Sequence, residues 1–157
     1  ESWGQFKTVE ITDWTNEYDP SRLVNSASGG NFFQTGDILD LHHYPAPNMY
    51  LYDANRVNVI GEYGGIGLPL EGHLWKTGNN WGYVKFNNSK EVTDEYVAYA
   101  EKLKELVSAG FSGAIYTQTT DVEGEINGLM TYDRDIDKLD VKRVNKINTE
   151  VINALNE

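Results

Sequence analysis

The first candidate for chemistry is Glu62, a carboxylate that follows a run of β-branched residues in RVNVIGEYGG (56–65). The end of a strand holds a side chain rigidly, and the two glycines that follow let the backbone turn away and leave room above the carboxylate. Burying a carboxylate is costly without a partner, and Tyr44, at the end of the preceding apolar run, is placed to donate a hydrogen bond to it. The alternative is a structural ion pair with Arg56 or Arg22.

Polar side chains also stand where the other apolar runs stop. They are Asn25 and Ser28, then Asp40, His42, His43 and Tyr44, then Glu62 and Tyr63, and finally Tyr116, Gln118, Asp121 and Glu123. In α/β folds, the carboxyl ends of parallel strands meet at one edge, where active-site loops gather. The sequence therefore predicts that these side chains converge on one site.

The pair His42–His43, with Asp40 two residues earlier, raises the question of a metal site. Adjacent residues on a strand point to opposite faces, so only one of the two rings can face the site. There is no His-x-His spacing, and the third histidine, His73, falls in a loop. We therefore predict no metal ligand set: one histidine forms a hydrogen bond near the site, and the other packs against a helix.

Further carboxylates recur in TTDVEGEINGLMTYDRD (119–135). Asp121, Glu123 and Glu125 are able to bind a cation or substrate hydroxyls. The alternative is a solvated loop whose carboxylates pair with Arg134 or Lys138. The small-residue segment SASGG (26–30) has neither the surroundings of a nucleophile elbow nor the Lys–Ser/Thr of a phosphate loop.

Composition excludes several classes of function. The chain of 157 residues has a net charge of −11 and a pI of about 4.6, so nucleic acid and anionic membrane surfaces are unfavourable partners. No apolar run approaches the ~20 residues of a membrane helix. With no cysteine there is no disulfide, thiolate zinc site or cysteine nucleophile, although the compartment stays open.

Aromatic residues are plentiful, with ten Tyr, five Phe and four Trp, and several fall in the Gly/Asn-rich segment EGHLWKTGNNWGY (71–83). Sugar-binding clefts use aromatics in this way, because the C–H faces of pyranose rings pack against flat rings. The alternative is that Trp75 and Trp81 cap the core beneath a long loop.

The elements that would position these residues alternate between strands and helices. Apolar runs predict strands at 22–28, 37–44, 56–63 and 111–119. Helical spacing predicts a helix over 91–109 with an Asn88–Glu91 capping box and a stop at Gly110. A second helix follows Asp140 as N-cap, with Val144, Ile147, Val151 and Leu155 on one face. A third, near the start, carries Ile11, Trp14 and Tyr18.

This alternation predicts a parallel sheet with crossover connections. Four parallel strands do not close a barrel, and an open sheet of this size leaves two unpaired edges. We therefore expect residues 1–157 to be a single partial domain that belongs to a longer chain or pairs with another half.

Taken together, these segments resemble the second half of the catalytic (β/α)8 barrel of family 2 glycoside hydrolases, the β-galactosidase, β-glucuronidase and β-mannosidase group. The resemblance covers nearly the whole chain. It is carried by ESWGQF, DPSRLVNSASGG, DLHHYPAP, GEYGG, GHLW, YTQTTDVEGEINGL and TYDR. The implied fold is α/β, the C-terminal half of a TIM barrel, with strands five to eight parallel and flanked by helices.

The resemblance also implies roles for particular residues. Glu1, leading into SWGQF, matches the general acid/base, although the Asn expected before it lies outside the chain. Glu62 matches the nucleophile, and Tyr44 the tyrosine that orients it. The eighth strand of many members ends in Trp, but here it ends in IYTQTTDVE. Expected substrate-binding residues are His43, Trp75, Asn25 and, in place of that Trp, Tyr116 and Gln118.

The implied activity is retaining hydrolysis of the O-glycosidic bonds of β-galactoside-like substrates, without a cofactor. The expected partners are the carbohydrate, the N-terminal half-barrel and β-sandwich domains of a parent chain, or a second copy. The isolated chain is expected to be weak or inactive, because no strand would hold Glu1. Two alternatives stay open: a non-catalytic, self-assembling half-barrel that binds carbohydrate, and a metal-dependent barrel hydrolase built on His42 and His43.

Overall fold

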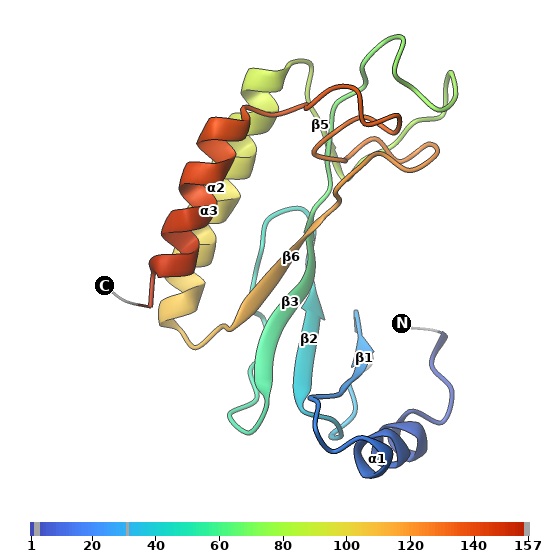
Figure 1. The fold of residues 1–157 in the computed structure, drawn as a ribbon, viewed down its shortest axis with the longest axis vertical. Helices are drawn as coiled ribbons and strands as arrows, with labels where there is room; N and C mark the ends of the chain where they lie inside the picture. The colour runs from blue at the N-terminus through green and yellow to red at the C-terminus, as the bar shows by residue number, and fades with distance from the viewer. Residues whose placement is uncertain (2–3, 31, 156–157) are drawn as a thin grey trace.

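A four-stranded parallel sheet forms the centre of the structure, a computed structural model that describes residues 1, 4–30 and 32–155. The strands run in the order β1 (Asn25–Ser28), β2 (Ile38–His42), β3 (Val57–Gly64) and β6 (Gly113–Thr117), as Figure 1 shows. Every neighbouring pair is parallel. The predicted α/β class and parallel pairing are confirmed, and each strand falls on a segment predicted to be one.

The register of the sheet brings the polar strand ends together. His42 of β2 lies opposite Glu62 of β3, after a register shift between Leu41 and His42. On the other side of β3, Tyr63 lies opposite Tyr116 of β6. Since all four strands run in the same direction, their carboxyl ends meet at one edge of the sheet.

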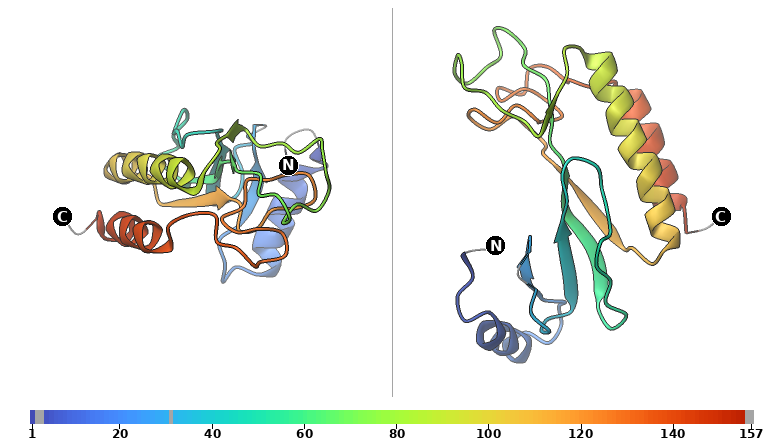
Figure 2. Two further views of the ribbon diagram at one scale, coloured as in Figure 1. Left: turned by 90° about the horizontal axis from the view of Figure 1, so that it is seen from above. Right: turned by 180° about the vertical axis from the view of Figure 1, so that it is seen from behind.

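Two long helices, α2 (Ser89–Ser108) and α3 (Val141–Asn153), lie side by side against the β3–β6 side of the sheet (Figures 1 and 2). The Asn88 side chain accepts a hydrogen bond from the Glu91 backbone N–H, as predicted. The Glu91 carboxylate reaches back one residue further than expected, to the N–H of Asn87. Asp140 caps α3, as predicted.

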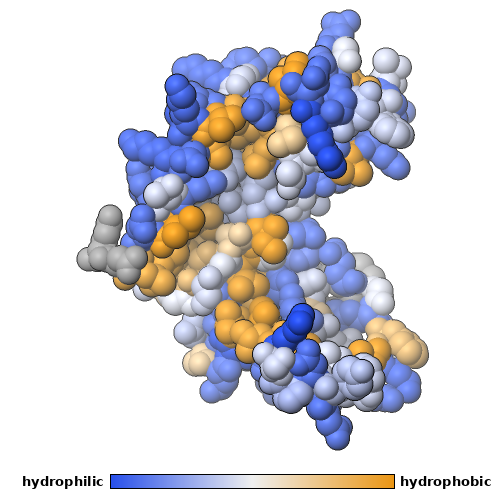
Figure 3. Space-filling view, viewed as in Figure 1, coloured by the Kyte–Doolittle hydropathy of each residue, from blue (hydrophilic) through white to orange (hydrophobic). Residues whose placement is uncertain are grey.

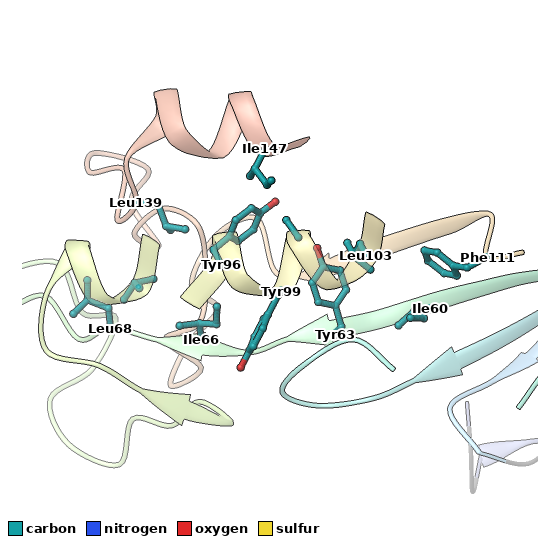
Figure 4. Packing of buried hydrophobic residues seen from close by; sticks show 12 residues of the cluster. Ile60, Tyr63, Ile66, Leu68, Tyr96, Tyr99, Leu103, Phe111, Leu139 and Ile147 are labelled. Atoms are coloured by element: carbon teal, nitrogen blue, oxygen red, sulfur yellow. The ribbon is translucent and has the colours of Figure 1, made fainter. Parts of the chain in front are cut away.

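The main core lies between β3 and the two helices. In Figure 4, Ile60 and Tyr63 of β3 point toward Tyr96, Tyr99 and Leu103 of α2, with Ile147 of α3 beyond them. The helix predicted over 91–109 is confirmed as α2, and Tyr96, Ala100 and Leu103, three of the residues at helical spacing, are buried in this core. Leu155 departs from its prediction, because it lies beyond the end of α3 and is exposed.

The first helix, α1 (Thr8–Tyr18), lies beside β1 at the opposite end of the molecule from α2. Its existence was predicted from Ile11, Trp14 and Tyr18, but all three side chains are exposed, and Trp14 stacks on Tyr18. The apolar face of α1 therefore has no cover within the part of the chain that the structure describes.

Two long connections form a lobe above the carboxyl ends of the strands. One follows β3 and contains the short parallel pair β4 (Ile66–Gly67) and β5 (Val84–Lys85), and the other joins β6 to α3. Figure 3 shows the molecule hollowed between this lobe and the part that carries β1 and α1. Among the described helices, none has the length and apolar character needed to cross a membrane.

Candidate active site

Glu62 lies at the carboxyl end of β3 and is held by a tyrosine. The Tyr44 hydroxyl donates a hydrogen bond of 2.8 Å to Glu62 Oε2, as predicted. Burial raises the pKa of Tyr44, so its hydroxyl stays protonated and able to donate at neutral pH. The predicted alternative of an ion pair to arginine is wrong: Arg56 pairs with Asp53 at 2.7 Å, and Arg22 pairs with Asp19.

His42 occupies the space between two carboxylates. Its Nδ1 lies 3.3 Å from Glu62 Oε2 and 3.8 Å from Glu1 Oε2, and its side chain is 11% exposed. Sequence reasoning had chosen the neighbouring histidine for substrate binding. His43 instead places its Nδ1 2.7 Å from the carbonyl oxygen of Ala46 and its ring against Tyr50. The imidazole at the carboxylates is therefore His42.

Asp40 lies next to His42 and is itself fixed by two hydrogen bonds. One carboxylate oxygen accepts a 2.5 Å hydrogen bond from the Asn25 side-chain amide, and the other accepts from the Gly61 backbone N–H at 2.9 Å. A Cβ at position 61 would overlap the Asp40 carboxylate, so the approach requires glycine. Asn25, an expected substrate ligand, thus uses its amide within the protein. His42 Nε2 lies 3.8 Å from Asp40.

The two predicted catalytic carboxylates are brought together. One oxygen of Glu1, Nδ1 of His42 and one oxygen of Glu62 all lie within 4.8 Å of one another. Both carboxylates remain accessible, with Glu62 34% and Glu1 56% exposed. Carboxyl pairs of retaining glycosidases are separated by about 5–5.5 Å, whereas inverting pairs are about 6.5–9.5 Å apart. The arrangement is compatible with the shorter class.

An aromatic wall, formed by Trp81 and Tyr83 of the segment 71–83, stands beside Glu62; the sequence indicated sugar-stacking aromatics in that segment but did not place these two rings at Glu62. Tyr83 stacks on Tyr44 with ring centroids 3.7 Å apart and planes 2° apart, and Trp81 meets Tyr83 edge-on at 5.7 Å. Burial raises the pKa of Tyr83, and the negative charges of Glu125, Glu62 and Glu1 raise it further. The charges of these three carboxylates therefore all act on the Tyr83 hydroxyl.

The two glycines after Tyr63 allow aromatic rings to pack directly against the backbone at the end of β3. Gly64 and Gly65 have φ values of +102° and +64°, which confirms the predicted turn. Each of the two glycines also lies against an aromatic ring. A Cβ on Gly64 would overlap the Tyr116 ring, and one on Gly65 would overlap Tyr83. The glycines thus allow two aromatic rings to lie on the backbone.

Other expected substrate ligands lie further from the pair. Trp75 is exposed, and its ring packs edge-on against Tyr132 in the lobe. Tyr116 lies between Tyr63 and Tyr96 in the core, and its hydroxyl donates to the carbonyl oxygen of Asn127. Gln118 donates its side-chain amide to Asn127 Oδ1 at 2.9 Å.

The carboxylates of the 119–135 segment divide into two kinds. Asp121 pairs with Lys138 at 2.6 Å, which confirms that expected partner, but both side chains are almost fully buried, so the expectation of a solvated pair is wrong for Asp121. Burial raises the pKa of Asp121 and lowers that of Lys138. Glu125 instead accepts a hydrogen bond from Asn127 and lies near Tyr83.

The set Glu1, His42 and Glu62 also has the donor types of a cation site, since one nitrogen and two carboxylate oxygens lie within ligand range of one point. The lack of His-x-His spacing concerns ligands on a single strand, whereas these three groups come from the chain start, β2 and β3. The same three groups are thus suited either to acid–base and nucleophilic chemistry or to holding a divalent cation.

No family model matches the chain, and no characterised protein matches it at a significant level of sequence similarity. A functional interpretation therefore depends on the residues and geometry described above.

Proposed function

We propose that this chain is the part of a retaining glycoside hydrolase that carries its two catalytic carboxylates, acting on β-galactoside-like substrates. The observation that carries the proposal is the approach of Glu1 and Glu62 around His42, with Glu62 held by Tyr44. The family 2 resemblance of the sequence implies these same roles for Glu1, Glu62 and Tyr44.

In the proposed reaction, a Glu62 oxygen attacks the anomeric carbon while Glu1 transfers its proton to the glycosidic oxygen, and the aglycone leaves as an alcohol. Water then attacks the same carbon of the glycosyl-enzyme ester. Glu1 takes the proton of that water, and Glu62 departs as a carboxylate. Tyr44 acts throughout as a hydrogen-bond donor that fixes the position of Glu62.

The accompanying fold proposal is that β1, β2, β3 and β6 are strands five to eight of a TIM barrel that an N-terminal half completes. Two observations support it. The strands β1 and β6 form the two edges of the sheet among the described residues. Beside the β6 edge lies an open groove of about 380 Å³, lined by Tyr63, Leu103, Phe111, Ile152 and Leu155 among others. A further strand and helix would cover that groove.

The test is a 2-deoxy-2-fluoro-β-galactoside with a good leaving group, followed by intact mass and peptide mapping. It is run on the chain alone and on the chain extended by its upstream coding sequence, with Glu62→Gln as the control. One covalent sugar on Glu62 in the extended protein is expected. Hydrolysis of the unfluorinated galactoside with no adduct on Glu62 would overturn the proposal.

Two other functions have an observation in their favour. The Glu1–His42–Glu62 set favours a metal-dependent hydrolase, whose activity would disappear with a chelator and return with a divalent cation. The two open sheet edges favour a self-assembling half-barrel that binds carbohydrate without turnover. That protein would change its solution mass with concentration and would remain unlabelled by the fluoroglycoside.

A further inference from the structure

The lobe above the sheet holds one carboxylate, Glu125, in a defined place beside an exposed aromatic residue. The Trp81 backbone N–H donates to the Gly124 carbonyl at 2.8 Å, and the Ile126 N–H donates to the Trp81 carbonyl at 2.9 Å. These bonds form a parallel bridge between Trp81 and Glu125. Two segments more than 40 positions apart in the sequence are thereby fixed side by side.

A buried amide sets the direction of the Glu125 side chain. Asn127 is fully buried, and its Nδ2 donates to Glu125 Oε1 at 3.0 Å while its Oδ1 accepts from Gln118 Nε2 at 2.9 Å. Gln118 directly follows β6, so the chain of amides connects the carboxylate to the end of the sheet. Among the described residues, Glu125 Oε2 receives no hydrogen bond, which leaves it available to a ligand.

The aromatic wall connects Glu125 to the catalytic pair. Tyr44, which holds Glu62, stacks on Tyr83 at 3.7 Å, and Tyr83 meets Trp81 at 5.7 Å. Trp81 and Tyr83 are 46% and 49% exposed. Because Trp81 stands two ring contacts away from Tyr44, a sugar packed on Trp81 would be the neighbour of the sugar at Glu62, not the same one.

We propose that Trp81, Tyr83 and Glu125 form a second sugar subsite, which binds a neutral sugar unit linked to the one cleaved at Glu62. This inference rests on the proposed function for the location of the cleaved sugar. The exposed rings pack against the C–H face of the pyranose, and Glu125 accepts hydrogen bonds from its hydroxyls. A uronic acid is disfavoured there, because its carboxylate would face Glu125. The Lys76 ammonium lies beside Gly124 but forms no ion pair with Glu125, which has no Lys or Arg ion partner among the described residues.

The preferred substrates are therefore neutral disaccharides or longer glycans. The test compares two substrates that share the cleaved sugar, a β-disaccharide and the corresponding β-glycosyl fluoride, whose leaving group is too small to reach Trp81. Trp81→Ala and Glu125→Gln are each expected to lower kcat/KM for the disaccharide by about 10- to 100-fold. For the fluoride, kcat/KM should change by no more than about twofold.

Trp14→Ala is the matched control, since it removes an exposed tryptophan of α1, outside the lobe, and it should leave the two kcat/KM values unchanged. Asn127→Asp keeps the acceptor for Gln118 but removes the donor to Glu125. As a positioning change, it should raise KM for the disaccharide selectively. Equal losses on both substrates, or no loss for Trp81→Ala and Glu125→Gln, would overturn the subsite.

Failure of the proposed catalytic function would be visible separately, as no turnover of either substrate by the chain extended by its upstream coding sequence, the protein in which the kinetic comparison is made. The subsite is then tested by calorimetric titration of the native chain with the disaccharide and with its uronic acid counterpart. Binding of the neutral sugar that Trp81→Ala abolishes and Trp14→Ala preserves would support the subsite. No binding, equal binding of the uronic acid, or equal binding by both variants would refute it.

Discussion

Asp40 and Asp121 are both buried carboxylates, 7% and 5% exposed, yet the groups around them differ in kind. Asp121 is neutralised by the Lys138 ammonium and also accepts from the Gly128 N–H. Asp40 is held by neutral donors, the amide of Asn25 and the N–H of Gly61. One carboxylate has a full countercharge inside the protein, and the other does not.

The two networks also end differently. The Lys138 ammonium also donates a hydrogen bond to the Ile126 carbonyl, so the network around Asp121 ends within the interior of the protein. The network around Asp40 continues through His42 to Glu62 and Glu1, which are accessible. A closed network contributes to stability, since removing one member leaves an uncompensated buried charge. An open network keeps groups available for a ligand, and its members should affect activity more than stability.

The largest expected effect is on activity, at the open network. Glu62→Gln removes the proposed nucleophile while keeping its size, so kcat/KM should fall at least about 1000-fold. The unfolding free energy should change by no more than about 1 kcal/mol, because the side chain is partly exposed. Steady-state kinetics and urea unfolding measure the two effects. Glu71→Gln, an exposed carboxylate of the lobe, should change neither.

The next largest effect is on stability, at the closed network. Lys138→Met leaves Asp121 buried without its countercharge, and the unfolding free energy should fall by about 3–5 kcal/mol. Chemical denaturation measures it. Lys90→Met, which breaks the exposed pair with Asp94, should change the free energy by less than about 1 kcal/mol. Equal effects of the two lysine changes would contradict the assignment of a closed network.

Tyr44→Phe tests a residue that contacts the open network through its hydrogen bond to Glu62, and compares its effect on activity with its effect on stability. The change removes one 2.8 Å hydrogen bond to Glu62 and preserves the ring that stacks on Tyr83. We expect kcat/KM to fall about 10- to 100-fold and the unfolding free energy by about 1 kcal/mol. Tyr52→Phe, at an exposed tyrosine, is the control. A loss of stability with unchanged kinetics would place Tyr44 among the structural residues instead.

The sequence predicted those parts of the molecule that depend on local patterns. Helical spacing and the Asn88 cap identified α2, and apolar runs identified the four strands. Glu62 and Tyr44 were found because each follows a buried run, where side chains of parallel strands converge. Their hydrogen bond followed from that placement alone.

What the sequence did not predict depends on contacts between distant segments. Strand alternation places His42 and His43 on opposite faces but does not say which face carries the site, whereas the pairing of β2 with β3 sets His42 opposite Glu62. Asp40 and His42 are two positions apart and therefore lie on the same face of β2, and this spacing could have identified His42 as the histidine of the site. Tyr83 and Trp81 reach the site through the two-residue pair β4–β5, which is too short for a periodic pattern to reveal.

The smallest effect concerns a third carboxylate, Asp133, which lies in the same lobe as Asp121 but is exposed. Its hydrogen bond from Thr131, with further contributions from His73 and the Asp135 N–H, lowers its pKa from 3.8 to about 2. A depressed folded-state pKa adds stability above the unfolded-state value, and this is lost as the pH falls from about 4 through about 2. Asp133→Asn should therefore reduce the fall in stability over that window.

Denaturant unfolding of the native chain and of Asp133→Asn at several pH values between about 4 and 2 measures this difference. The effect should be small, because solvent screens an exposed pair. Asp135→Asn, at an exposed neighbouring carboxylate, provides the control. If Asp133→Asn loses stability with acid as steeply as the native chain does, the Thr131 and His73 contacts contribute nothing. A carboxylate of this lobe would then contribute to stability only where it is buried, as Asp121 is.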